Sequence, residues 1–203
     1  MINELDIPDN KLWKYVDDTT ISETVAKNRP SIIQTAVDTF VTKADEDKFQ
    51  LNEAKCKELR ITSSTTNNSF DPIVINGSEI ECVPKAKILG MHITCNLKWN
   101  CHIEEIGKKS RKRMYCLSQL KRSGLGTQEL IQFYRICIRP LTEYACPVFH
   151  DSLQKHLSEE LERIQRRAMR IIFPFKPYQE ALAQAGLETL SARRQFLTNK
   201  LFS

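Results

Sequence analysis

The feature that most constrains the fold of this chain is a change in sequence periodicity near residue 97. Before it, short β-prone runs alternate with turn-forming residues, and one amphipathic stretch lies among them. After it, apolar residues recur at helical spacing to the end of the chain. A length of 203 residues suffices for one fair-sized core or two small ones. We therefore expect an α+β protein, with a partial antiparallel sheet and a packing helix followed by an all-α region.

The first β-prone segment carries two adjacent carboxylates, Asp17 and Asp18. Leu12-Trp13 and Tyr15-Val16 precede them, and Thr19-Thr20-Ile21 follows. A strand that turns at the two acids and returns as a second strand places both at the tip of a hairpin. Acids held together at an exposed tip repel each other, and such hard oxygen ligands suit Mg²⁺, which takes one or two carboxylates together with substrate phosphates. Asp17 and Asp18 are therefore candidate Mg²⁺ ligands.

Turn and helix signals predict the other elements of the first part. Asn76-Gly77 tolerates the positive φ values of a tight turn and is the clearest hairpin signal in the chain. Gly90 would permit a bulge or a close backbone approach inside a strand. The expected elements are, in order, a helix over about 31–48 capped by Ser31, a strand over 56–62, a polar loop over 63–69, a hairpin over 73–83 and a strand over 87–93.

The second part reads as a series of helices separated by glycine and proline. The expected helices are one over about 102–122, one capped by Thr127 and interrupted at Pro140, one capped by Ser158 and ended by Pro174, a short one from 178 to 185 stopped by Gly186, and a last one over about 190–202. The apolar residues of the third helix recur at Leu161, Ile164, Ala168 and Ile171.

Cysteine usage and hydropathy indicate the compartment. The seven cysteines are an odd number without a CxxC motif, and residues 1–10 carry no Lys or Arg and do not resemble a signal peptide. We expect reduced thiols, an intracellular location in nucleus or cytoplasm, and no membrane span. The residue types of His92, Cys95, Cys101 and His102 can bind Zn²⁺, but their spacing matches no common zinc motif, so no structural zinc is expected.

Charge is distributed unevenly along the chain. Residues 1–84 carry 9 Lys and Arg against 15 Asp and Glu, a net of −6, whereas residues 85–203 carry 21 against 10, a net of +11. The basic second part suits contact with a polyanion such as nucleic acid. The alternative is an ordinary solvated surface, since helical surfaces are often basic without a ligand.

Four segments carry a resemblance to a known family. Tyr15-Val16-Asp17-Asp18, in the setting LWKYVDDTTI, resembles the aromatic-x-Asp-Asp box of non-LTR (LINE-type) retrotransposon reverse transcriptases. The similarity continues through Leu51-Asn52-x-x-Lys55-Cys56, Lys87-Ile88-Leu89-Gly90 and Glu162-Arg163-Ile164-Gln165-Arg166-Arg167-Ala168. The chain thus looks like the C-terminal part of an RNA-directed DNA polymerase. The resemblance implies a partial palm over 1–97, a helical thumb-like region over 98–173 and a helical tail over 174–203.

The resemblance also implies a chemistry for the parent enzyme, which is two-metal nucleotidyl transfer with Mg²⁺. Asp17 and Asp18 would be the metal ligands, and Lys55 would lie near the triphosphate of the incoming dNTP, where a cation stabilises the leaving pyrophosphate. Lys87 and Gly90 would belong to the region that grips the primer. The implied partners are an RNA template, a DNA primer and dNTP. The alternatives are a solvated lysine at 55 and a purely structural hairpin over 73–83.

Two clusters of basic residues lie in the helical part. The candidate nucleic-acid-binding residues are Lys108, Lys109, Lys112 and Arg113, which lie with Arg111 in one cluster, and Arg163, Arg166, Arg167 and Arg170. Spacings of three and four residues place the second set on one side of a helix, where cations suit phosphate contact without sequence reading. In the alternative interpretation, Glu159, Glu160 and Glu162 pair with these arginines.

Two-metal catalysis needs a further carboxylate and the fingers, which in the resembled family lie upstream of the Asp-Asp hairpin. The chain has none of these in the family's setting, so we expect a catalytically incomplete fragment whose N-terminal polymerase half would be a missing partner. Two other classes stay open. One is a non-catalytic nucleic-acid-binding remnant that uses the basic helices, and the other is a structural or regulatory fragment that binds a partner polymerase through its incomplete sheet.

Overall fold

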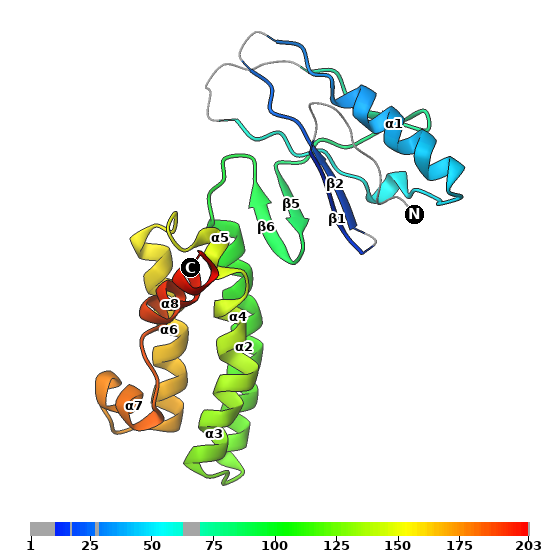
Figure 1. The fold of residues 1–203 in the computed structure, drawn as a ribbon. Coiled ribbons are helices and arrows are strands. Elements are labelled where there is room, and N and C mark those ends of the chain that lie inside the picture. The colour runs from blue at the N-terminus through cyan, green and yellow to red at the C-terminus, as the bar shows by residue number, and fades with distance from the viewer. Residues whose placement is uncertain (1–10, 17, 27–28, 63–69, 203) are drawn as a thin grey trace. The chain divides into compact units, whose positions relative to one another are not determined.

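The computed structural model describes residues 11–16, 18–26, 29–62 and 70–202 (Figure 1). Asp17 lies outside the described residues, as do residues 1–10 and the polar loop expected over 63–69. The chain divides into two compact units between Ala86 and Lys87. The domain boundaries expected at 97 and 173 follow from the family resemblance and stay a prediction.

The first unit combines short antiparallel strands with one long helix (Figure 1). Its elements are β1 (Lys11–Tyr15), β2 (Asp18–Ser22), α1 (Ile33–Glu46), the 3₁₀ turn η2 (Glu53–Lys55), β3 (Val74–Ile75), β4 (Ser78–Glu79) and the start of β5 (Lys85–Ile88). The strands pair as β1 with β2, β3 with β4, and β5 with β6 (Met91–Thr94), so the described chain is a mixed protein with small antiparallel two-stranded sheets. The prediction of an α+β chain is confirmed at this level.

Helix α1 buries one face against β2 and β3. Ala36, Val37, Phe40 and Ala44 are its buried residues, at the spacing of a helical stripe. The side chain of Gln34 forms two hydrogen bonds with the backbone of Val74 in β3. Its amide nitrogen donates to the Val74 carbonyl over 2.8 Å, and its oxygen accepts from the Val74 N–H over 2.9 Å. This one side chain of α1 thereby holds β3 beside the helix.

The predicted cap and strand of this unit need correction. Ile32, not Ser31, occupies the N-cap of α1 without a side-chain bond, although the Ser31 hydroxyl accepts from the Ile33 N–H over 3.3 Å. The strand expected over 56–62 is wrong, since only a single parallel bridge joins Glu58 to Cys82. The Arg60 side chain donates instead to Glu58 and to the Phe70 carbonyl, so this segment is held by a side chain rather than by a ladder.

The predicted hairpin at Asn76-Gly77 is confirmed, with φ of +49° and +77° at the turn. The single strand expected over 87–93 is wrong, because this segment contains a turn. It is itself a hairpin, because Leu89 and Gly90, with φ of +46° and +83°, form the turn between β5 and β6. Two consecutive positive φ values make a tight turn where the sequence suggested a bulge.

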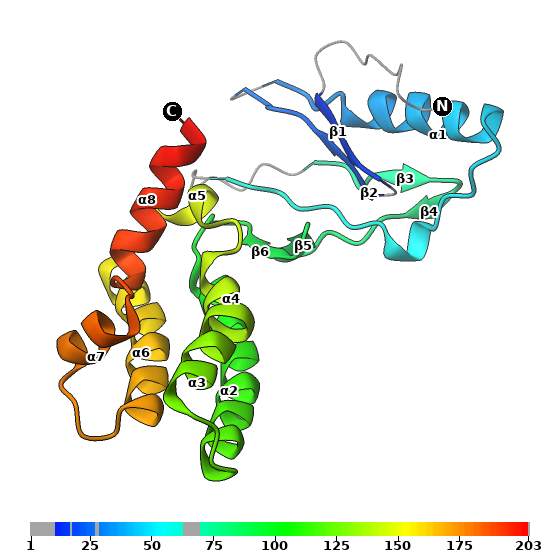
Figure 2. The same cartoon turned by 60° about the horizontal axis from the view of Figure 1, so that its bottom comes forward.

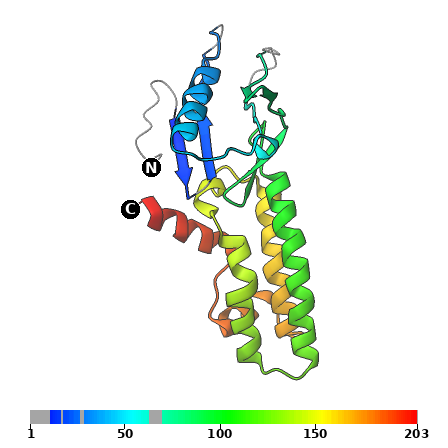
Figure 3. The same cartoon turned by 90° about the vertical axis from the view of Figure 1, so that its right-hand side faces the viewer.

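The second unit is helical (Figure 2). Its helices are α2 (Asn100–Arg122), α3 (Thr127–Phe133), the π-helical segment η3 (Tyr134–Ile138), α4 (Arg139–Glu143), α5 (Cys146–Phe149), α6 (Lys155–Ile172), α7 (Tyr178–Ala185) and α8 (Leu190–Phe202). Helices α2 and α6 pack side by side along their length (Figure 3). The expected positions of α2, α7 and α8 are confirmed, as is the interruption before Pro140.

Two expected caps in this unit are wrong. Gly126 rather than Thr127 precedes α3, and α6 begins at Lys155, so Ser158 lies inside the helix. The Ser158 hydroxyl is instead the acceptor for the buried guanidinium of Arg194 over 2.8 Å. The Ser158 side chain therefore forms a tertiary contact with α8 and does not cap α6.

The core of this unit contains a connected set of polar side chains. Tyr134, fully buried in η3, donates to the Gln165 side chain. The Gln165 amide donates to the Tyr178 hydroxyl over 3.0 Å and to the Glu188 carbonyl over 2.8 Å. Tyr178 in turn donates to Glu162, and burial raises the pKa of both tyrosines, which keeps them protonated donors. Satisfied networks of this kind fix helix register.

All seven cysteines lie in the described residues and are free thiols. Among the described helices, none is both long and apolar enough to cross a lipid bilayer.

Candidate nucleic-acid interface

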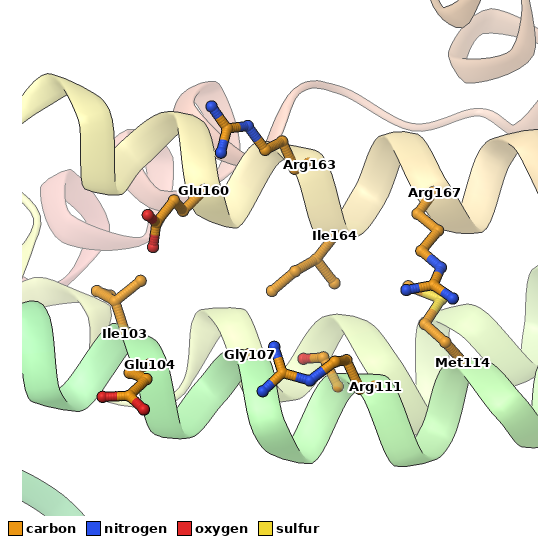
Figure 4. A pocket seen from close by; sticks show the side chains of 10 residues that line it. Ile103, Glu104, Gly107, Arg111, Met114, Glu160, Arg163, Ile164 and Arg167 are labelled. Carbon is orange, nitrogen blue, oxygen red and sulfur yellow. The ribbon is translucent and has the colours of Figure 1, made fainter.

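Helices α2 and α6 enclose a groove of about 330 Å³ within the second unit (Figure 4). Both helices contribute residues to its walls. The residues that line it are Ile103, Glu104, Gly107, Ser110, Arg111 and Met114 of α2, and Glu160, Arg163, Ile164 and Arg167 of α6.

The floor of the groove is apolar except at one position. Ile103 and Met114 are buried, and Ile164 is half-buried. Gly107 leaves a gap because it has no side chain, and a Cβ placed there would lie 3.7 Å from the nearest Arg111 nitrogen. Ser110 is only 1% exposed, and its hydroxyl has no hydrogen-bond partner among the described residues. The floor therefore offers apolar surface and one unused hydroxyl.

The rim carries three exposed guanidinium groups, those of Arg111, Arg163 and Arg167 (Figure 4). In the described chain, no carboxylate lies within 4.0 Å of any of them. Glu104, at the other end of the groove, pairs with Lys108 over 2.9 Å. These arginines are therefore available to an external anion.

Three of the other predicted basic residues, Lys108, Arg113 and Arg166, contact neighbouring groups of the protein. Lys108 is paired with Glu105 over 2.7 Å as well as with Glu104, and these hydrogen bonds raise its pKa. Arg113 donates to the Cys137 carbonyl, and the Arg166 guanidinium lies 5.3 Å from the ring centre of Tyr178.

Three predicted cations are exposed and have no ion pair within the described part of the chain; these are Lys109, Lys112 and Arg170. The predicted arginine row of α6 is thus divided. Arg163 and Arg167 line the groove, whereas Arg166 contacts α7.

The acidic residues of α6 do not neutralise these arginines through close pairs. Within the described residues, neither Glu159 nor Glu160 forms an ion pair, and Glu162 accepts from the Tyr178 hydroxyl and, over 3.4 Å, from the Leu190 N–H. The pairing alternative considered from the sequence therefore does not describe the groove.

The hairpin expected at the Asp-Asp motif forms, with Trp13 opposite Thr20, but the expected place of Asp18 in the turn is wrong, because Asp18 is the first residue of β2 and lies opposite Tyr15. Asp18 is exposed, and Val16 is 91% exposed with a φ of +57°. Asp17 lies outside the described residues. Among those that are described, no three His, Cys, Asp or Glu side chains gather as a metal site would require. The Mg²⁺ site expected at Asp17 and Asp18 stays a prediction from the sequence.

The remaining predicted site residues are not among those that line the groove. Lys55 ends η2 and is exposed, and its N–H donates to the Asn52 side chain over 3.2 Å. Lys87 is exposed in β5, and Gly90 lies in the turn against Tyr144.

The sequence interpretation missed the carboxylates and the floor of the groove. Gly107, Ser110, Arg111 and Met114 follow a spacing of three, four and seven residues, which places them on one face of α2. That signal was present, but it does not show which helix lies opposite.

Comparison with protein-family models, with curated proteins and with solved structures finds no match for the chain in any of the three. The resemblance to non-LTR reverse transcriptases therefore stays a prediction from the sequence motifs.

Proposed function

We propose that the chain derives from a non-LTR retrotransposon reverse transcriptase and that its helical unit binds a nucleic-acid duplex. The palm and thumb assignment belongs to this proposal. The observation that carries it is the set of guanidinium groups at the α2–α6 groove, Arg111, Arg163 and Arg167, which have no carboxylate within 4.0 Å in the described chain.

The binding chemistry follows from the shape of the guanidinium group. Its planar fork of N–H donors matches two phosphate oxygens at once, so Arg binds phosphate with defined geometry. Such contacts position a duplex and do not read its sequence. Exposed Lys109, Lys112 and Arg170 would add contacts at neighbouring phosphates. An enzyme that copies any template needs this kind of sequence-independent grip.

In the parent polymerase, Asp17 and Asp18 would hold Mg²⁺, which activates the primer hydroxyl and neutralises the triphosphate. Exposure of Asp18 at the hairpin and of Lys55 at the end of η2 is compatible with contact to an external ligand. The role of Lys55 beside the triphosphate rests on the resemblance.

A second candidate function is non-catalytic binding of nucleic acid. It is favoured because the groove is built entirely from α2 and α6, so binding needs no residue of the Asp-Asp hairpin. Primer extension with Mg²⁺ and dNTP separates the two. Product formed by this chain would establish the polymerase function and exclude purely non-catalytic binding, and the absence of product would favour the second candidate.

Duplex binding itself is tested by fluorescence anisotropy with a labelled RNA–DNA hybrid. Replacement of Arg111, Arg163 and Arg167 together by Gln should weaken binding by about tenfold or more at low salt, because counterion release at the phosphates is lost. Replacement of Arg122, Lys155 and Lys176 together by Gln is the matched control for loss of charge, because these are three exposed cations that do not line the groove. Equal weakening in both variants would show that net charge, and not the groove, determines affinity.

A further inference from the structure

We propose that the α2–α6 groove binds one unpaired nucleotide, with its base on the apolar floor and its phosphate at the arginines. This inference rests on the proposed function, because it names the part of a nucleic acid that the same site takes up.

The size of the groove argues for a small occupant. A volume of about 330 Å³ lies near the lower end of the range for small-molecule sites. A duplex could contact the rim but would leave the floor of Ile103, Met114 and Ile164 uncovered. An unstacked base has two apolar faces, and bases commonly pack on apolar side chains and on guanidinium planes.

The groove has an acidic end and a basic end. Glu104 precedes Arg111 by seven residues on α2, and Glu160 precedes Arg167 by the same interval on α6. Seven residues correspond to about 10 Å along a helix axis. Figure 4 shows Glu160 and Glu104 on the two helices toward one end, with the Arg163 guanidinium on the side of Glu160, Arg111 near the middle and Arg167 at the other end.

A nucleotide has the matching polarity. Its phosphate is anionic, and a base such as cytosine carries an exocyclic amino group that donates to carboxylates. Phosphate at the arginines therefore places the base toward Glu104 and Glu160. The ion pair of Glu104 with Lys108 involves exposed side chains, so it presents little barrier to this exchange.

Ser110 provides the second, independent observation. Its hydroxyl is buried in the floor and has no partner in the described part of the chain. A hydroxyl both donates and accepts, so it can bond a base edge or a ribose hydroxyl. An occupant of the groove would satisfy this group, which otherwise stays buried without a hydrogen bond.

The test measures the affinity of the full chain for three labelled probes. They are a blunt RNA–DNA duplex, the same duplex with a single-stranded cytosine overhang, and the same duplex with a thymine overhang. We expect the cytosine overhang to bind about tenfold more tightly than the blunt duplex, as for one well-stacked base. We expect the thymine overhang to increase affinity less, because thymine has no exocyclic amino group. The Glu160→Gln variant should reduce the difference in affinity between the cytosine and thymine overhangs.

Filling the groove is the matched structural test. Gly107→Leu should remove the overhang preference, and its Cβ would make only an ordinary contact with Arg111, so the helix can accept it. Gln179→Leu, at an exposed position of α7, adds the same side chain outside the groove and should keep the preference. Thermal melting of both variants checks that each is folded. Ser110→Ala, which changes the groove volume less, tests whether the hydroxyl of the floor contributes to the overhang preference.

The outcomes distinguish the unpaired-nucleotide inference from the proposed binding of a duplex. Equal affinity for blunt and overhang probes would overturn the unpaired-nucleotide inference and leave duplex binding in place. Failure to bind any of the three probes would overturn the proposed function and this inference with it. Displacement of the overhang probe by a polyglutamate peptide, but not by cytidine monophosphate, would overturn the inference in favour of an acidic protein segment as occupant.

Discussion

The hydroxyl of Tyr144 donates a hydrogen bond to the main-chain carbonyl of Leu89 over 2.6 Å. The same ring lies against Gly90, where an added Cβ would be 3.4 Å from the Tyr144 Cε1 atom. Tyr144 follows α4 directly, and Leu89 and Gly90 form the turn between β5 and β6. One side chain therefore attaches the predicted primer-grip turn to the helices of the second unit.

Substitutions at this contact should lower stability to different degrees. Gly90→Ala places a Cβ at φ +83° beside the ring and should cost about 1–2 kcal/mol. Tyr144→Phe removes one partly exposed hydrogen bond and should cost about 0.5–1 kcal/mol. Urea unfolding measures both. An unchanged midpoint for Gly90→Ala would contradict the left-handed turn at this position.

The backbone at Val16 predicts a stabilising substitution. A β-branched residue at φ +57° is strained, and this strain lies in the hairpin that carries the Asp-Asp motif. Val16→Asn should raise the stability of the first unit by about 1 kcal/mol, since Asn tolerates the left-handed region. Thermal unfolding followed by Trp13 fluorescence, in a Trp99→Phe background so that one tryptophan reports, is the measurement. Val41→Asn in α1 is the control for loss of a valine elsewhere. A lower melting temperature for Val16→Asn would contradict the strained turn.

Strongly periodic segments were predictable from the sequence, and their partners were not. The extent of α2 follows from apolar spacing, and that of α7 from the Gly186 stop. The Asn76-Gly77 turn follows from local backbone preference, whereas Leu89-Gly90 carries a leucine at positive φ that local preference does not favour. Contact with Tyr144, far along the chain, accompanies that turn.

The candidate site shows the same limit. Arg163 and Arg167 were predicted on one helix face, but the opposition of α6 to Gly107 and Ser110 of α2 depends on tertiary packing. The cap expected at Ser158 failed for the same reason, since this hydroxyl accepts from Arg194 of α8. The residue spacing within one helix predicts which face a residue lies on, but it does not predict which element that face contacts.

Buried His102 predicts a pH dependence of stability. Burial, with smaller contributions from His92 and Lys109, lowers its pKa below the usual 6.5. Its Nδ1 accepts from the His92 N–H over 3.4 Å, and its Nε2 has no partner in the described chain, so the fold favours the neutral ring.

The unfolded chain then binds a proton more readily than the folded one at mildly acidic pH. The free energy of unfolding should reach its full value above about pH 6.5. It should fall as the pH drops below that value, before the carboxylates titrate. Unfolding midpoints across this range measure the effect, and His102→Phe should flatten it. The same slope in this variant would assign the effect to other groups.

Arg194 predicts an unusual gain of stability. The side chain is 0% exposed, and its Nε and Nη1 have no partner among the described residues, while burial lowers its pKa. Arg194→Met keeps most of the volume and removes an underpaired buried charge, so it should raise stability by about 1–3 kcal/mol. Arg193→Met, which removes an ion pair with Glu143, is the neighbouring control and should not stabilise. A clear loss in Arg194→Met would show that this charge is compensated.

The most direct test of the central claim is the salt dependence of duplex binding. The affinity of the full chain for a blunt RNA–DNA hybrid is measured between about 50 mM and about 200 mM salt. Contacts of Arg111, Arg163 and Arg167 with phosphates predict a linear fall of log K with log salt, and the triple Gln variant should lower the slope by about 2–3. A slope that is absent, or that is the same in the triple variant, would contradict binding of nucleic acid at the α2–α6 groove.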